Sequence, residues 1–219
     1  MKRSSPVSLA AAAAILVLLA LSGCNRAMFR LPMWSGPFPE TPTGYATKRV
    51  RSAELSVLLP TDLRKEHYGE KVAGTKWKAC RTDGLRGDAA LKIIQDRLAL
   101  ELNRSGLYKN VRTGGDASAP LVLKTEIDAF CSQARGFVLI PWTRVAGITS
   151  LHFTLVDSGK VVFDEKLERV VTDADKEYTG TGVGTIGEAM HVTMADSLRG
   201  VIAQLLRDLD ERAPADNPR

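Results

Sequence analysis

Apolar and polar residues alternate along the middle of the chain, which predicts β-strands that bury one face. Residues 54–59 form such a run and end at Pro60, which cannot donate a backbone hydrogen bond to a neighbouring strand. Residues 121–131 form a longer run, in which the odd-numbered positions are apolar, small or β-branched. This alternation predicts one long strand and places Cys131 on its core side.

Two further alternating runs, at residues 148–156 and 161–171, predict a β-hairpin. The residues between them, 157–160, have the composition of a tight turn. The apolar odd-numbered positions of the first run share one face, so His152 is expected on the other face.

A different spacing predicts two helices. Residues 89–105 carry apolar side chains three and four positions apart, and Gly106 follows as a helix-ending residue. Residues 186–209 repeat the pattern, whereas the polar stretch at residues 61–86 predicts no more than a short strand at 76–80. The order of elements predicts an α+β fold, with a mostly antiparallel sheet packed on two helices in a two-layer sandwich.

The segment from Phe137 to Trp142 is continuously apolar and fits neither spacing. It is either a buried strand or an exposed surface for a partner, since solvated loops seldom carry such a run. Under the second interpretation, Phe137, Leu139 and Trp142 form the partner surface.

The amino-terminal residues have the features of an export signal. Lys2 and Arg3 precede an apolar stretch at residues 7–21, which is short for a permanent membrane span. The stretch ends in residues 21–24, Leu-Ser-Gly-Cys, which resemble the lipobox of bacterial lipoproteins. The resemblance implies that residues 1–23 are removed and that Cys24 receives lipid, including palmitate; an uncleaved signal anchor is the alternative.

The lipid on Cys24 would tie the protein to a membrane without a spanning helix. Asn25 stands where lipoproteins retained in the inner membrane tend to have aspartate, so the periplasmic face of the outer membrane is the expected location. Residues 24–53 are rich in proline and show no periodicity, which predicts a flexible lipidated tether. The folded domain is expected at residues 54–210 and a disordered tail at 211–219.

Two cysteines remain beyond the lipobox, Cys80 and Cys131. An even number of cysteines in an oxidising compartment predicts a disulfide between them, although two buried free thiols are the alternative. No metal site is predicted, because the sequence has no CxxC or HxxxH spacing and its three histidines are scattered.

Composition and charge exclude several functional classes. With 44% hydrophobic and 25% charged residues the chain is an ordinary globular protein, and a formal net charge of +5 without a basic stripe predicts no nucleic-acid partner. Residues 182–187 match G-x-G-x-x-G, but they open the last helix instead of following the first strand of a βαβ unit, so no nucleotide or other cofactor is predicted. No nucleophile motif is present, so no enzyme activity is predicted, and His191 is expected to be structural.

The order of parts resembles the YajG-type bacterial outer-membrane lipoproteins and, more broadly, small periplasmic α+β lipoproteins. The resemblance rests on the lipobox, the helix end at residues 102–108, the turn at 157–160 and the closing helix. It implies a non-catalytic envelope lipoprotein that serves as an accessory or scaffold subunit of an assembly or transport complex, with an envelope protein as partner. The alternative is a periplasmic carrier of lipid or lipopolysaccharide.

Overall fold

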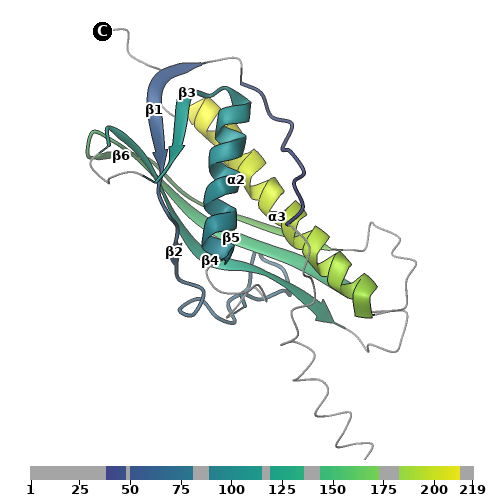
Figure 1. The fold of residues 1–219 in the computed structure, drawn as a ribbon. Helices are drawn as coiled ribbons and strands as arrows, with labels where there is room; N and C mark the ends of the chain where they lie inside the picture. The colour runs from purple at the N-terminus through teal and green to yellow at the C-terminus, as the bar shows by residue number, and fades with distance from the viewer. Residues whose placement is uncertain are drawn as a thin grey trace, which may run out of the picture.

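A computed structural model describes residues 38–47, 50–80, 89–114, 119–135, 144–172 and 183–212, without the side chains of residues 135 and 183–186. It is an α+β fold of six strands and two helices (Figure 1). The strands are β1 (Arg51–Val57), β2 (Thr61–Asp62), β3 (Tyr108–Thr113), β4 (Leu121–Arg135), β5 (Arg144–Asp157) and β6 (Lys160–Thr172). The helices are α2 (Ala89–Ser105) and α3 (Val183–Arg212). Neither is long and apolar enough to cross a bilayer.

The sheet is mixed, with its long ladders antiparallel. Its strand order is β3-β1-β4-β5-β6, and β2 pairs with β4 off this path. The β4–β5 and β5–β6 ladders are antiparallel, as the hairpin pattern predicts. The three short pairings, β1–β3, β1–β4 and β2–β4, are parallel. The pairing of β1 with β3 is parallel because α2 connects the two strands as a crossover, so that β3 runs in the same direction as β1.

Both helices cover one face of the sheet, which is called the inner face below (Figure 1). In α2 the fully buried residues Ile94, Leu98 and Leu102 repeat every four positions, so one stripe of the helix enters the core. They join Leu55 of β1 and Phe153 of β5 in a single cluster.

The contact between α3 and β5 is backbone against backbone. A Cβ atom added at Gly147 would lie well inside van der Waals distance of the Thr193 and Met194 main chain, so no larger residue fits there. Next to this point the hydroxyls of Thr149 and Ser197, both fully buried, are 2.7 Å apart and hydrogen-bonded. Small residues on both elements therefore allow the helix to lie close to the strand.

A β-bulge in β4 overturns the expected orientation of Cys131. Ile127 pairs with Leu151 and Ala129 pairs with Ser150, so Asp128 is an extra residue in β4. The insertion exchanges the two faces: Phe130 enters the inner core, while Ala129 and Cys131 face the opposite, outer side. Cys131 is buried, but in a second and smaller cluster.

Several elements differ from the sequence-based expectation: β4 runs to Arg135, β5 begins at Arg144, and the expected short strand at residues 76–80 is reduced to a single bridge between Lys71 and Lys78. β1 begins at Arg51, whose guanidinium donates to the Leu209 carbonyl at 2.7 Å and lies 5.7 Å from the centre of the Tyr108 ring. α3 extends to Arg212, which forms an ion pair with Glu165. Residues 38–47 lie within the segment predicted to be a flexible tether, but Phe38 and Tyr45 pack against the core.

Candidate functional site

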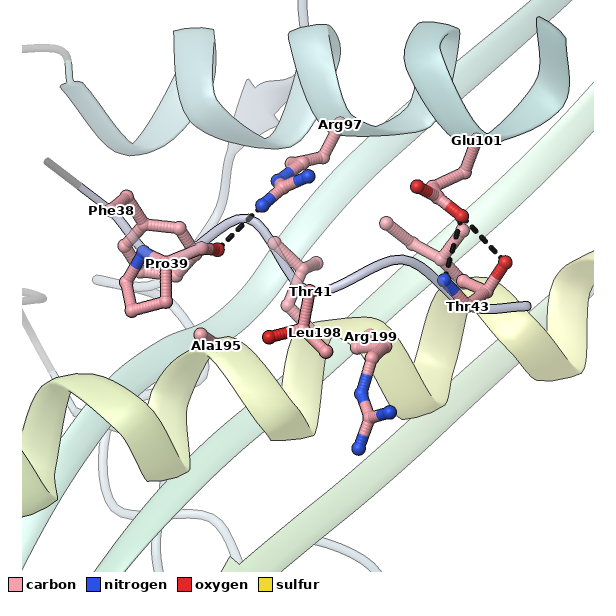
Figure 2. Close-up of a pocket in the computed structure, with 10 residues that line it drawn as sticks. Phe38, Pro39, Thr41, Thr43, Arg97, Glu101, Ala195, Leu198 and Arg199 are labelled. Carbon is pink, nitrogen blue, oxygen red and sulfur yellow. Dashed lines mark hydrogen bonds between the residues drawn. The ribbon is translucent and has the colours of Figure 1, made fainter. Parts of the chain in front are cut away.

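Residues 38–47, called the strap below, lie along the groove between α2 and α3 (Figures 1 and 2). The Pro39 carbonyl accepts a hydrogen bond from the Arg97 guanidinium of α2. A small cavity beside the strap is lined by Phe38, Pro39 and Thr43 together with Ala195 and Ile202 of α3. The strap therefore connects the amino-terminal segment to both helices.

Glu101 of α2 is the main polar partner of the strap. Its carboxylate accepts hydrogen bonds from the Thr43 N–H at 2.8 Å and the Thr43 hydroxyl at 2.5 Å, and it pairs with Arg104 at 3.1 Å (Figure 2). The residue is 3% exposed. Burial pushes the pKa of Glu101 up, but the donors from Thr43 and Arg104 outweigh it and leave the pKa below its ordinary value.

The two ends of the strap are fixed at opposite ends of α3. The Tyr45 hydroxyl donates to Asp210 at 2.6 Å, and burial together with this carboxylate raises the pKa of Tyr45 to about 12. The Phe38 ring lies 5.0 Å from His191 and 5.9 Å from Phe130. At about 1.5 Å per residue His191 and Asp210 are about 28 Å apart along the helix. The seven residue steps from Phe38 to Tyr45 span at most about 25 Å, so the Phe38 and Tyr45 side chains cover the remaining distance.

His191 is part of this packing. It is 6% exposed, and burial lowers its pKa, which favours the neutral ring. Its edge-on contact with Phe38 agrees with the expected structural role.

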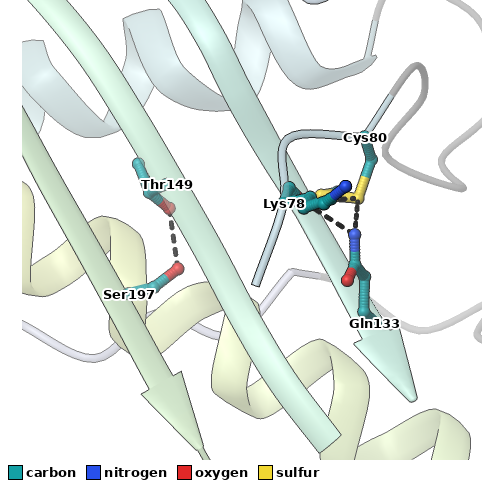
Figure 3. The surroundings of a disulfide bond; sticks show 6 residues. Lys78, Cys80, Gln133, Thr149 and Ser197 are labelled. Atoms are coloured by element: carbon teal, nitrogen blue, oxygen red, sulfur yellow. Dashed lines mark hydrogen bonds between the residues drawn. A yellow bond between two sulfur atoms is a disulfide. The ribbon is translucent and has the colours of Figure 1, made fainter. Parts of the chain in front are cut away.

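The outer face of the sheet carries a short reversal of the chain at residues 69–80, called the knuckle below. Val72, Trp77 and Ala79 of the knuckle are buried against Ala129 and Ile148 of the sheet. A disulfide joins Cys80 to Cys131, and the Gln133 side chain donates to the Lys78 carbonyl at 2.7 Å (Figure 3). The predicted Cys80–Cys131 pairing is thus present, and it attaches the knuckle to the end of β4.

The bulge residue Asp128 organises a group of charges beside the knuckle. Its carboxylate, 5% exposed, accepts from Lys166 Nζ at 2.7 Å and lies 3.3 Å from His67 Nε2. Burial lowers the pKa of Lys166, but Asp128 more than offsets this and the pKa is raised overall. Glu168 accepts from Ser150 of β5 and from the Ala73 N–H of the knuckle.

His152 bridges two carboxylates across three strands. Its Nδ1 lies 3.2 Å from Glu126 of β4 and its Nε2 lies 2.7 Å from Asp164 of β6. Burial lowers the pKa of His152, but the hydrogen bonds to these carboxylates raise it overall. Both ring nitrogens face carboxylates, and the Thr154 hydroxyl donates to Asp164. The arrangement is a charge network and not a nucleophile–base pair.

Two cavities among the described residues differ in size and lie in different parts of the fold. The space left beside the strap is about 10 Å³, because the strap itself fills the groove between the helices. A larger hollow of about 570 Å³ lies at the β1–β3 side of the sheet, bordered by Glu54, Arg112 and Asp157.

Several predicted site residues lie outside the described residues: Cys24, Phe137, Leu139 and Trp142. Within the described ranges, no group of three metal-ligating side chains comes together. The residues that sequence reasoning missed are Glu101, Asp128 and Arg97. The one available signal was Phe130, a large apolar residue at an even-numbered position that follows the polar even-numbered residues Lys124, Glu126 and Asp128, which marks the bulge.

The comparisons concern structure alone, since no family model and no curated protein matches the sequence. The chain is similar to a Xanthomonas campestris protein of family DUF330, with 14% identity, a TM-score of 0.50 and coverage of 76% of this chain and 89% of that one. A weaker structural match is to a minor lipoprotein from Acinetobacter baumannii, with 16% identity, a TM-score of 0.38 and coverage of 77% of this chain and 99% of that one. At these identities the similarity to the Xanthomonas protein shows a shared fold and nothing beyond the fold.

Proposed function

We propose that this chain is a non-catalytic lipoprotein of the bacterial envelope, held by lipid on Cys24 at the periplasmic face of the outer membrane. Its α+β domain serves as an accessory or scaffold subunit and presents surfaces to an envelope protein. The lipobox at residues 21–24 supports the anchor, and the Cys80–Cys131 disulfide supports an oxidising compartment.

The observation that carries the proposal is the docking of the strap. Hydrogen bonds from Thr43 to Glu101 and from Tyr45 to Asp210 fix the strap to both helices. Phe38, the first described residue after the proposed anchor, is therefore held at one defined place on the domain. A scaffold gains from such an arrangement, because its partner surfaces then keep a constant orientation to the membrane.

The carrier alternative has less support. A lipid held between helices and sheet needs a cavity of a few hundred Å³. Among the described residues, the strap leaves about 10 Å³ in the groove between the helices, and the hollow of about 570 Å³ lies at the β1–β3 side of the sheet, bordered by the charged residues Glu54, Arg112 and Asp157.

The anchor is tested with Cys24→Ser in the full chain. Wild type should incorporate radioactive palmitate and fractionate with the outer membrane, whereas the variant should do neither. Equal fractionation of both, or no palmitate in wild type, would overturn the proposal.

The scaffold role is tested by crosslinking in intact cells followed by mass spectrometry. We expect one envelope protein to be crosslinked reproducibly through the domain. Recovery of stoichiometric lipid beyond the anchor, with no protein neighbour, would favour the carrier instead.

A further inference from the structure

The knuckle has two unlike sides. Its chain reverses through the backbone hydrogen bonds from Val72 to Trp77 and from Ala79 to Glu70. Lys71 and Lys78 are partners in an antiparallel bridge and therefore lie opposite each other. Because side chains alternate along such a ladder, Val72 and Trp77 are buried on the sheet while the lysines point away from it.

The side that points away from the sheet is basic. Lys71, Lys76 and Lys78 are all exposed; the bridge places Lys71 and Lys78 on the same side of the reversal, and Lys76 Nζ lies 6.0 Å from the centre of the Trp77 ring. Like charges directly across a ladder are destabilising. Within the described ranges neither Lys71 nor Lys78 forms an ion pair with a carboxylate, so an external anion would remove this cost.

The basic side lies at the end of the sheet where Phe38, the first described residue of the strap, packs. The knuckle is attached there by the Cys80–Cys131 disulfide and by Gln133. Phe38, the first described residue of the strap, packs on Phe130, the neighbour of Cys131 in β4. The disulfide and the strap thus bring the knuckle and Phe38 to neighbouring positions of β4, on opposite faces of the sheet.

We propose that the lysine side of the knuckle docks on anionic phospholipid headgroups of the membrane that holds the lipid anchor. This inference rests on the proposed function, because the anchor brings the knuckle to the membrane. The chain from Cys24 to Phe38 reaches at most about 50 Å, which keeps the knuckle within reach of the bilayer. Lysines near an anionic surface are attracted to it over about one Debye length, and together with the acyl chains they orient the domain.

The test uses the full lipidated chain, reconstituted in vesicles of phosphatidylcholine alone or with phosphatidylglycerol. Mass spectrometry first verifies lipid on the Cys24 peptide, so a failed anchor is recognised separately. The rate of labelling by an amine-specific reagent is then measured at Lys71, Lys76 and Lys78. The internal controls are exposed lysines elsewhere in the domain: Lys109, Lys124 and Lys160.

We expect the three knuckle lysines to be labelled several times more slowly in the phosphatidylglycerol vesicles, and the control lysines to be unaffected. High salt should abolish the protection. Equal labelling in the two kinds of vesicle would overturn the proposal. Protection in intact cells without protection in anionic vesicles would also overturn it, in favour of an acidic protein partner.

A matched pair of variants provides a second measurement. K71Q/K76Q/K78Q should lose the protection from hydrogen exchange that anionic vesicles give to the knuckle backbone, whereas K109Q/K124Q/K160Q should retain it. The first variant should unfold at the same temperature as wild type or above it, because it removes the like-charge pair. Retained vesicle-dependent protection in the first variant would contradict the proposal.

Discussion

Glu101 shows how one buried carboxylate attaches a segment that has no secondary structure. Ordering an extended stretch costs about 1–2 kcal/mol per residue in backbone entropy, so the strap needs strong contacts to stay in place. Charge-assisted hydrogen bonds are about twice as strong as neutral ones, and Glu101 accepts two of them from Thr43. The strap therefore depends on a few polar contacts and on Phe38.

Glu101→Gln should lower the free energy of unfolding by about 1–2 kcal/mol at neutral pH, measured by urea denaturation. The pKa of Glu101 is lowered by folding, so its contribution is present above the unfolded pKa and is lost as the pH falls through the folded pKa. The difference between variant and wild type should therefore shrink at acidic pH. Asp96→Asn, which removes an exposed pair with Lys92 on the same helix, is the control and should cost less than about 0.5 kcal/mol.

His152 should make stability depend on pH in the opposite direction. Its pKa is raised by folding, so the stabilisation is fully present below the unfolded pKa of about 6.5 and is lost as the pH rises through the folded pKa. Glu126 and Asp164 face the ring, and Lys166 lies beside it on β6. Between pH 6 and 8.5 the urea midpoint of wild type should fall more steeply than that of His152→Gln. Parallel plots of midpoint against pH would show that the His152 bridge does not contribute to the free energy of unfolding.

At the scale of elements, the close approach of α3 to β5 depends on a residue without a side chain. Gly147 is the point where the strand meets the Thr193 main chain, and backbone cannot move aside as a flexible side chain can. The buried hydroxyl pair of Thr149 and Ser197 needs the same short separation. One glycine thus determines how both layers pack.

Gly147→Ala should destabilise the protein by about 3 kcal/mol or prevent folding, because overpacking costs about 1–3 kcal/mol and here the neighbour is main chain. The matched variant is Gly200→Ala in α3, where the added methyl would meet only the flexible Arg169 side chain. It should be neutral or stabilising by up to about 1 kcal/mol, because alanine favours helix over glycine. Thermal unfolding of both variants measures the contrast, and equal losses would contradict it.

At the scale of the whole molecule, the disulfide joins the outer cover of the sheet to a central strand. Cys80 and Cys131 are 51 residues apart, and the loop they close contains α2 and β3. The bond therefore restricts the unfolded chain over a large part of the domain, and it keeps the knuckle in place over a cluster that is small on its own.

The C80A/C131A double variant should lose about 3–4 kcal/mol of unfolding free energy, as the entropy of a loop of this length implies. Trypsin should also cut the variant earlier at Lys71, Lys76 or Lys78, because the knuckle is no longer held on the sheet. Wild type treated with reductant is the control and should behave like the variant. Unchanged cleavage in both would mean that apolar packing alone retains the knuckle.

Much of the fold follows from local spacing. Both helices, the hairpin and the long strand were predicted within a few residues, and the two cysteines pair as expected. The strap was missed because its contacts are made by single residues, such as Thr43 and Tyr45, with no repeating pattern. The orientation of Cys131 was wrong because one inserted residue, Asp128, shifts the alternation by one position.

The sequence by itself determines the helices and the long strands, because spacings of two and of three to four residues define which side of an element is apolar. The pairing of the cysteines was predicted from their even number in an oxidising compartment. It also carries the lipobox, on which the proposed anchor depends. The tertiary structure alone decided that the strap lies in the helix groove, that the sheet has a second cluster on its outer face, and that Lys71 and Lys78 lie opposite each other on the knuckle. These features depend on contacts between residues far apart in the chain, whose energies local patterns do not contain.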